Sequence, residues 1–120
     1  MTTAPSRLGC CVTWRRCVRG DVHRLQAPRE ARGHEQRGAR YAVILQSDDL
    51  PLSTLLVAPT STSARSASFR PDIEIEGRTT RVLAEQTAAV DPNRLGDLVM
   101  HLGFDEIRQV EAALRLVMDL

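Results

Sequence analysis

The chain has 120 residues and a formal net charge of +1, which suits one domain with a single modest core. It contains no apolar run of about 18 residues, so we predict no membrane-spanning helix, and its N-terminal region lacks the continuous apolar segment of a signal peptide. Three cysteines, Cys10, Cys11 and Cys17, do not make a disulfide framework, so we expect reduced thiols and a cytoplasmic protein.

All 16 basic residues are arginine, and they are unevenly distributed. Residues 1–40 contain nine arginines and three acids, whereas residues 71–120 contain five arginines and ten acids. Arginine offers a planar, permanently charged fork that matches phosphate. A basic half is what an RNA-binding face requires, although the charge would have no such role if it were spread evenly over the surface.

Residues 1–17 show no helical or strand period, and we expect a disordered extension before a domain formed by residues 18–120. The alternative is an ordered extension that packs Trp14 on the domain. Residues 18–25 alternate weakly and predict a strand, and a long loop follows to residue 39. Residues 41–46 and 54–59 are short apolar runs, which are typical of strands buried on both faces.

The second half begins with the clean alternation of residues 73–76, which predicts an exposed strand that turns at Gly77. We expect further strands at 82–90, with a possible bend, and at 98–102, and a helical turn that Asp91 caps. Residues 104–120 predict a helix with one apolar face, formed by Ile107, Val110, Leu114, Val117 and Met118. The fold class is therefore mainly β with a C-terminal helix, as a small, partly open barrel that the helix caps.

Six short motifs follow one another through residues 19–95. They are Arg19-Gly20-Asp21-Val22, Gly33-His34-Glu35-Gln36, the stretch 40–48, Pro59-Thr60-Ser61, Glu85-Gln86 and Asp91-Pro92-Asn93-Arg94-Leu95. Each motif is weak alone, but together and in this order they resemble the MazF/PemK family of toxin endoribonucleases. The resemblance covers residues 19–120.

This resemblance implies an SH3-like barrel of the type shared by CcdB and PemK toxins, which forms a homodimer and binds RNA along the dimer groove. It also implies a sequence-specific endoribonuclease that needs neither a metal ion nor another cofactor. Its expected partners are single-stranded RNA and a small MazE-like antitoxin, with no membrane. The RNA 2′-OH would attack the phosphate and leave a 2′,3′-cyclic phosphate and a 5′-OH.

By the same resemblance, the catalytic pair is Arg40, which opens the second strand, and Ser61, which ends the third. The alternatives are a surface ion pair of Arg40 with Asp48 or Glu35, and ordinary turn chemistry for the hydroxyl. The remaining residues expected to bind substrate are Arg19, His34, Glu35, Gln36, Arg37, Thr60, Thr62 and Gln86.

The general base stays open, because an unperturbed arginine has a pKa above about 12 and accepts a proton poorly. His34 or Glu35 would suit that role better, although His34 also fits a solvated loop histidine. Glu85 is expected to pair with an arginine and order the site. Tyr41 stands where the family has proline, so it can stack on a base or lie half-buried.

Two rival functions follow from the same pattern. A CcdB-like toxin would bind DNA gyrase through the closing helix and cut nothing. A catalytically weak relative would bind RNA with a salt-dependent affinity and leave it intact.

Overall fold

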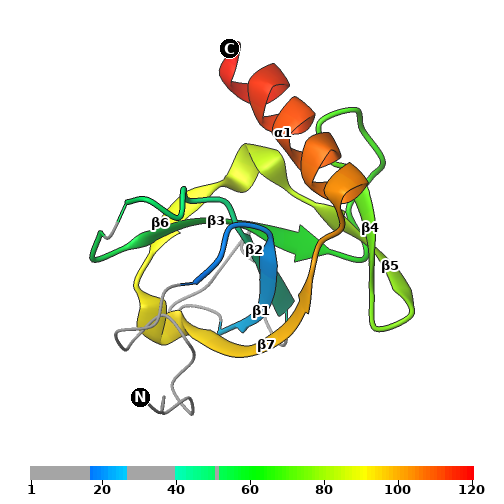
Figure 1. Cartoon of the computed structure of the whole chain (residues 1–120). Coiled ribbons are helices and arrows are strands. Elements are labelled where there is room, and N and C mark those ends of the chain that lie inside the picture. Colours follow the sequence, from blue (N-terminus) through cyan, green and yellow to red (C-terminus); the bar gives the residue numbers. More distant parts are fainter. Residues whose placement is uncertain (1–16, 27–39, 51) are drawn as a thin grey trace.

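The computed structural model describes residues 17–26, 40–50 and 52–120, and these form one curled antiparallel sheet with a single α-helix (Figure 1). The sheet runs in the order β4-β5-β3-β2-β1-β7, and β6 pairs with the other end of β3. The strands are β1 Asp21–Leu25, β2 Arg40–Ile44, β3 Leu55–Ser61, β4 Asp72–Ile75, β5 Arg78–Val82, β6 Ala88–Val90 and β7 Leu95–His101. The helices are the two 3₁₀ turns η3 Ala84–Gln86 and η4 Pro92–Arg94 and the α-helix α1 Phe104–Met118. The predicted fold class is confirmed.

Apolar side chains fill both sides of the curled sheet. Ala42, Val43 and Ile44 of β2 are all at most 1% exposed, which confirms a strand buried on both faces. One cluster joins the sheet to α1 through Leu102 and Val110, and a second cluster lies among β1, β2, β3, the end of β6 and the start of β7. The sheet therefore curls around its own side chains while α1 closes one end.

The start of β1 is fixed against α1 by Gly20. This residue has φ +94°, a backbone conformation that residues other than glycine rarely adopt. A Cβ at this position would lie 2.9 Å from Cδ1 of Ile107. Its carbonyl oxygen accepts the N–H of Leu102 at 2.9 Å. Helix α1 begins directly after, where the carboxylate of Glu106 accepts the N–H of Gly103 at 3.0 Å.

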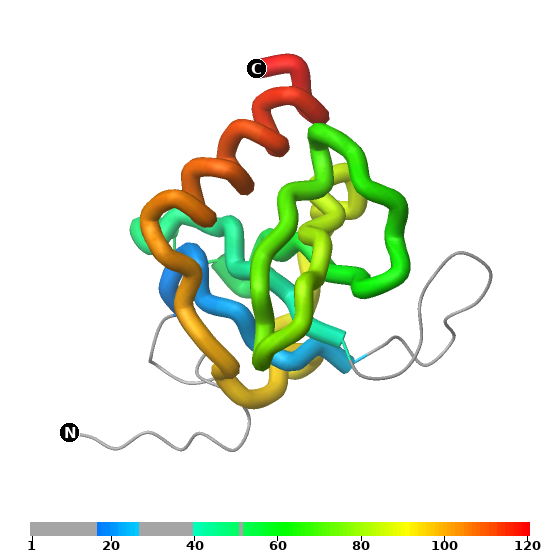
Figure 2. Tube along the Cα trace, turned by 90° about the vertical axis from the view of Figure 1, so that its right-hand side faces the viewer, coloured from blue at the N-terminus to red at the C-terminus, as the bar shows by residue number. Residues whose placement is uncertain are grey.

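Three expectations from the sequence are wrong in detail. The last strand begins at Leu95 rather than at 98, and residues 84–86 form η3 rather than a continuous strand. The apolar face of α1 is core only in its first turns, because Val117 is 39% and Met118 is 49% exposed. Figure 2 shows the reason: the C-terminal end of the helix extends away from β1 and β2.

At the N-terminal end, Cys17 is buried and disulfide-bonded, so the expectation of three reduced cysteines is wrong for this residue. The cysteines therefore do not indicate a reducing compartment. Trp14 and the rest of residues 1–16 lie outside the described residues. Within the described part of the chain, no helix has the length and apolar composition to cross a membrane.

Candidate active site

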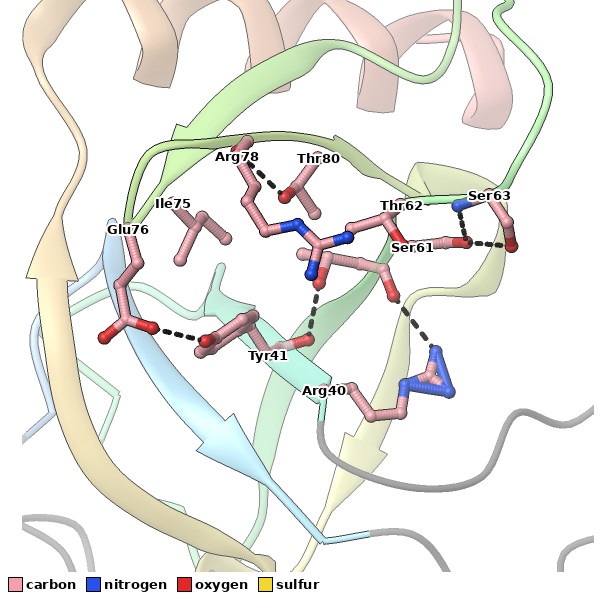
Figure 3. A pocket seen from close by; sticks show the side chains of 10 residues that line it. Arg40, Tyr41, Ser61, Thr62, Ser63, Ile75, Glu76, Arg78 and Thr80 are labelled. Atoms are coloured by element: carbon pink, nitrogen blue, oxygen red, sulfur yellow. Dashed lines mark hydrogen bonds between the residues drawn. The ribbon is translucent and has the colours of Figure 1, made fainter.

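A pocket of about 320 Å³ lies where β2 begins, β3 ends and the β4–β5 hairpin folds over (Figure 3). Antiparallel pairing explains this position: β2 and β3 run side by side in opposite directions, so the first residue of one lies near the last residues of the other. The lining residues are Arg40, Tyr41, Thr60, Ser61, Thr62, Ser63, Ile75, Glu76, Arg78 and Thr80. Arg40 and Ser61, which lie 21 positions apart in the sequence, thus share one cavity.

Arg40 is a buried cation, with only 9% of its surface exposed. Its Nη2 donates to the carbonyl oxygen of Thr60 at 3.0 Å, while its buried Nε has no hydrogen-bond partner among the described residues. No described carboxylate forms an ion pair with it, and Asp48 instead accepts the backbone N–H of Arg19 at 2.8 Å. Burial lowers the pKa of Arg40, and the nearby charge of Arg94 lowers it further. This guanidinium is therefore desolvated and still able to bind an anion.

The Ser61 hydroxyl stabilises the turn that follows β3 and can also donate its hydrogen to a ligand. Its Oγ accepts the backbone N–H groups of Ser63 at 3.1 Å and Ala64 at 3.0 Å, which is the turn chemistry expected of a serine at a strand end. It also lies 3.3 Å from Oγ of Ser63. Because a hydroxyl has one hydrogen to donate, Ser61 can direct it either to Ser63 or to a ligand oxygen in the pocket.

The two threonines beside Ser61 differ in what they can offer a ligand. Thr60 is 2% exposed, its Oγ1 donates to the carbonyl of Tyr41 at 3.2 Å, and its own carbonyl holds Arg40. It therefore links β2 to β3 and orients the guanidinium. Thr62 is exposed at the rim of the pocket.

The loop after Ser61 is held by two further arginines. Arg70 donates to Oε2 of Glu85 through Nε at 3.0 Å and Nη2 at 2.7 Å, which confirms the predicted pairing of Glu85. Arg81 donates from Nη1 to the carbonyl of Ala64 at 3.1 Å and lies 3.2 Å from Asp72. These contacts fix the backbone groups that in turn hold the Ser61 hydroxyl.

Several predicted substrate-binding residues lie elsewhere. Gln86 is exposed on η3 and does not line the pocket. Arg19 pairs with Glu111 of α1, so it joins the segment before β1 to the helix. His34, Glu35, Gln36 and Arg37 lie outside the described residues. No three His, Cys, Asp or Glu side chains gather as possible metal ligands in the ranges 17–26, 40–50 and 52–120.

The sequence did not reveal the pocket wall that the β4–β5 hairpin supplies. Glu76, with φ 51°, and Gly77, with φ 82°, form the tight turn that brings Arg78 back over the site. The hydroxyl of Tyr41 donates to Oε1 of Glu76 at 2.7 Å, and this hydrogen bond raises the pKa of the half-buried phenol. Arg24 lies over the Tyr41 ring, with 5.5 Å from its Cζ to the ring centroid, and 3.7 Å from Oε2 of Glu76.

The family model described as PemK-like, MazF-like toxin of type II toxin–antitoxin system matches residues 18–118. The chain belongs to the MazF/PemK toxin family. A Mycobacterium tuberculosis (strain ATCC 25618 / H37Rv) relative named "Putative toxin Rv3098A/RVBD_3098A" is 43% identical over 97 residues, which cover 80% of this chain and 92% of the relative. This family is the one that the six motifs of residues 19–95 resemble.

Solved structures of MazF proteins share this fold. A MazF from Deinococcus radiodurans superimposes with a TM-score of 0.71 at 20% identity, covering 87% of this chain and 97% of its own. An endoribonuclease from a mycobacterial species, solved in complex with its cognate antitoxin, gives a TM-score of 0.70 at 18% identity and covers 87% and 96% of the two chains. At these identities the likeness establishes the MazF fold.

Proposed function

We propose that this MazF/PemK toxin is a sequence-specific endoribonuclease that cleaves single-stranded RNA without a metal ion, with Arg40 and Ser61 as its catalytic residues. The observation that carries the proposal is the pocket they share, in which a desolvated guanidinium has no carboxylate partner among the described residues. Such a cation is suited to a phosphate and its developing negative charge. Endoribonuclease is also the name of one of the mycobacterial proteins with this fold.

In the proposed reaction, the 2′-oxygen of the RNA forms a bond to phosphorus while the bond from phosphorus to the 5′-oxygen breaks. The 2′-OH proton passes to a base, and the leaving 5′-oxygen takes up a proton, so the products are a 2′,3′-cyclic phosphate and a 5′-OH. Arg40 stabilises the charge on the non-bridging oxygens, and Ser61 donates its hydroxyl hydrogen to one of them. The base stays open: the lowered pKa of Arg40 enlarges its small neutral fraction, the only form that can accept a proton, and His34 and Glu35 are the other candidates for that step.

Thr60 and Thr62 are proposed to support substrate binding in two different ways. Thr62 is exposed at the rim and can contact the RNA directly, whereas Thr60 acts by holding Arg40. The residues that stay predictions for RNA binding are Arg19, His34, Glu35, Gln36, Arg37 and Gln86.

The partners are proposed from the family and from the named neighbours. One fold neighbour was solved in complex with its cognate antitoxin, and others from Deinococcus radiodurans are MazE–MazF structures. We infer that this chain forms a homodimer in the cytoplasm and is neutralised by a MazE-like antitoxin. An acidic antitoxin segment would compete with RNA for the Arg40 pocket, because both present anionic groups to the same cation.

Cleavage of a long unstructured RNA in EDTA tests the proposal, with wild type, Arg40→Ala and Ser61→Ala. Arg115→Ala is the matched arginine control because that side chain is exposed on α1, and Ser66→Ala is the matched serine control on the neighbouring loop. We expect discrete cuts with 5′-OH ends from wild type and both controls, and none from the two site variants. Ser61→Thr keeps the hydroxyl and should restore cleavage.

A gyrase-binding toxin of the CcdB type is the second candidate, and the exposed end of α1 favours it. Leu116, Met118 and Leu120 are 56%, 49% and 81% exposed, so this helix end presents an apolar surface. Intact RNA in the presence of a folded dimer, together with loss of toxicity on substituting these three residues, would replace the nuclease proposal with this one.

A further inference from the structure

Arg78 places a second positive charge at the active-site pocket. It is the first residue of β5, it is exposed, and its side chain lines the cavity opposite β2. Figure 3 shows its guanidinium reaching from the hairpin across the pocket toward Ser61 and Thr62. Among the described residues, no carboxylate pairs with it.

Three other arginines near the sheet form ion pairs with acidic side chains, which distinguishes them from Arg40 and Arg78. Arg24 pairs with Glu76, Arg70 with Glu85 and Arg81 with Asp72. Among the described residues, the only acid that lines the pocket is Glu76, and its carboxylate already accepts the Tyr41 hydroxyl and lies beside Arg24. Arg40 and Arg78 are thus two cations on one cavity that no described carboxylate pairs with, and binding of an anion there is favourable.

The hairpin holds Arg78 in a defined place. Its backbone pairs with Ile75 across the β4–β5 turn, and its carbonyl accepts Oγ1 of Thr80 at 3.2 Å. The turn itself is joined to β2 by the hydrogen bond between Tyr41 and Glu76. The position of Arg78 relative to Arg40 is therefore set by paired strands, which favours binding of a ligand with two anionic groups.

Resting on the proposed function, we propose that Arg78 is a second phosphate-binding residue, which holds a phosphate of the RNA that flanks the scissile one. The scissile phosphate lies at Arg40 and Ser61, and the strand then continues across the pocket to the β4–β5 hairpin. Contacts to a flanking phosphate fix the register of the chain without reading its sequence. Arg78 thereby sets which phosphate faces Ser61.

The probe is a short RNA that spans the cleavage site mapped for wild type and carries a single 2′-deoxy nucleotide there, so that it binds without being cut. Its Kd is measured over a range of salt for wild type, Arg78→Ala, Arg78→Lys and the matched control Arg108→Ala, an exposed arginine on α1. We expect Arg78→Ala to weaken binding about ten- to a hundredfold. Its slope of log Kd against log salt should become shallower by about 0.7, the value for one phosphate contact on a single strand.

Arg78→Lys should recover the slope because it restores the charge, and Arg108→Ala should match wild type. Cleavage of the unmodified RNA by Arg78→Ala should show a raised KM with a smaller change in kcat. Equal Kd and slope for Arg78→Ala and Arg108→Ala would overturn the assignment of Arg78 while wild-type cleavage upholds the nuclease. Absence of cleavage and binding by wild type would overturn both.

Discussion

Replacing Arg40 with methionine should abolish activity and leave stability almost unchanged. Two opposing changes are involved. The variant loses the hydrogen bond from Nη2 to the Thr60 carbonyl, and bonds from charged groups contribute about 1.5–3 kcal/mol. It also removes a buried charge that lacks a carboxylate partner among the described residues and that Arg94 repels, and burying such a charge costs several kcal/mol. Methionine fills similar space with an unbranched apolar chain.

We therefore expect the free energy of unfolding to change by no more than about 1 kcal/mol in either direction, which is a Tm shift within about 5 °C. This change in the free energy of unfolding should not depend on pH in the neutral range. Because the pKa of Arg40 is lowered yet the group stays charged in both states at neutral pH, its cost is fully present there and is relieved only at strongly alkaline pH. Activity should fall at least about a hundredfold, as when one donor to a developing oxyanion is lost.

The assay is thermal or urea unfolding beside RNA cleavage, with Arg70→Met as the matched control. Arg70 forms an ion pair with Oε2 of Glu85 in which both side chains are mostly buried, and Oε1 of Glu85 has no hydrogen-bond partner among the described residues. Breaking that pair leaves a carboxylate unpaired, so Arg70→Met should cost about 2 kcal/mol or more. If Arg40→Met lost as much stability as this control, Arg40 would be a structural cation that stabilises the fold rather than a desolvated cation held ready for an anion.

Three further predictions concern groups around the site and the core. Tyr41 is the only tyrosine, so the phenolate absorbance titrates it alone; its midpoint should lie above 10.0 in wild type and fall in Glu76→Gln. Because the folded pKa is raised, stability should also decrease as pH rises through the unfolded value, and Glu76→Gln should flatten that alkaline limb. Gly20→Ala should destabilise the fold by about 2 kcal/mol or more in urea, from the positive φ and the contact with Ile107. The pKa of Glu111 is lowered by the arginine it pairs with, so stability from this pair should be lost as pH falls below 4.5, and Glu111→Gln should remove that acid dependence.

The strands that the sequence predicted well are those whose neighbours bury them fully. Residues 42–44 and 57–58 lie at the centre of the sheet and are buried on both faces. Their side chains are therefore apolar, and the sequence shows them as continuous apolar runs. The start of β7 was missed because this strand pairs, among the strands that the structure describes, with β1 alone, through irregular register, and leaves Asp97 and Leu98 exposed. An exposed, bulged edge imposes no alternation on the sequence.

For the site, the sequence supplied the two residues that the family order marks, Arg40 and Ser61, and the structure brings them into one pocket. Glu76 and Arg78 could not be found this way, because Glu-Gly-Arg is an ordinary turn when it is considered alone. Their place over the pocket comes from the pairing of Thr60 with Val82 in β5, which is a long-range contact. Gln86 shows the reverse case, since its motif is present but its side chain does not line the pocket.

The most direct test of the mechanism changes a single oxygen of the substrate. Once the cut position is mapped, wild-type protein is incubated in EDTA with two RNAs that differ only by a 2′-deoxy substitution at the nucleotide before the cut. We expect the all-ribose RNA to be cleaved to a 2′,3′-cyclic phosphate and a 5′-OH and the substituted RNA to stay intact. Cleavage of the substituted RNA at the same bond would show that the 2′-OH is not the nucleophile, and the roles proposed for Arg40 and Ser61 would be contradicted.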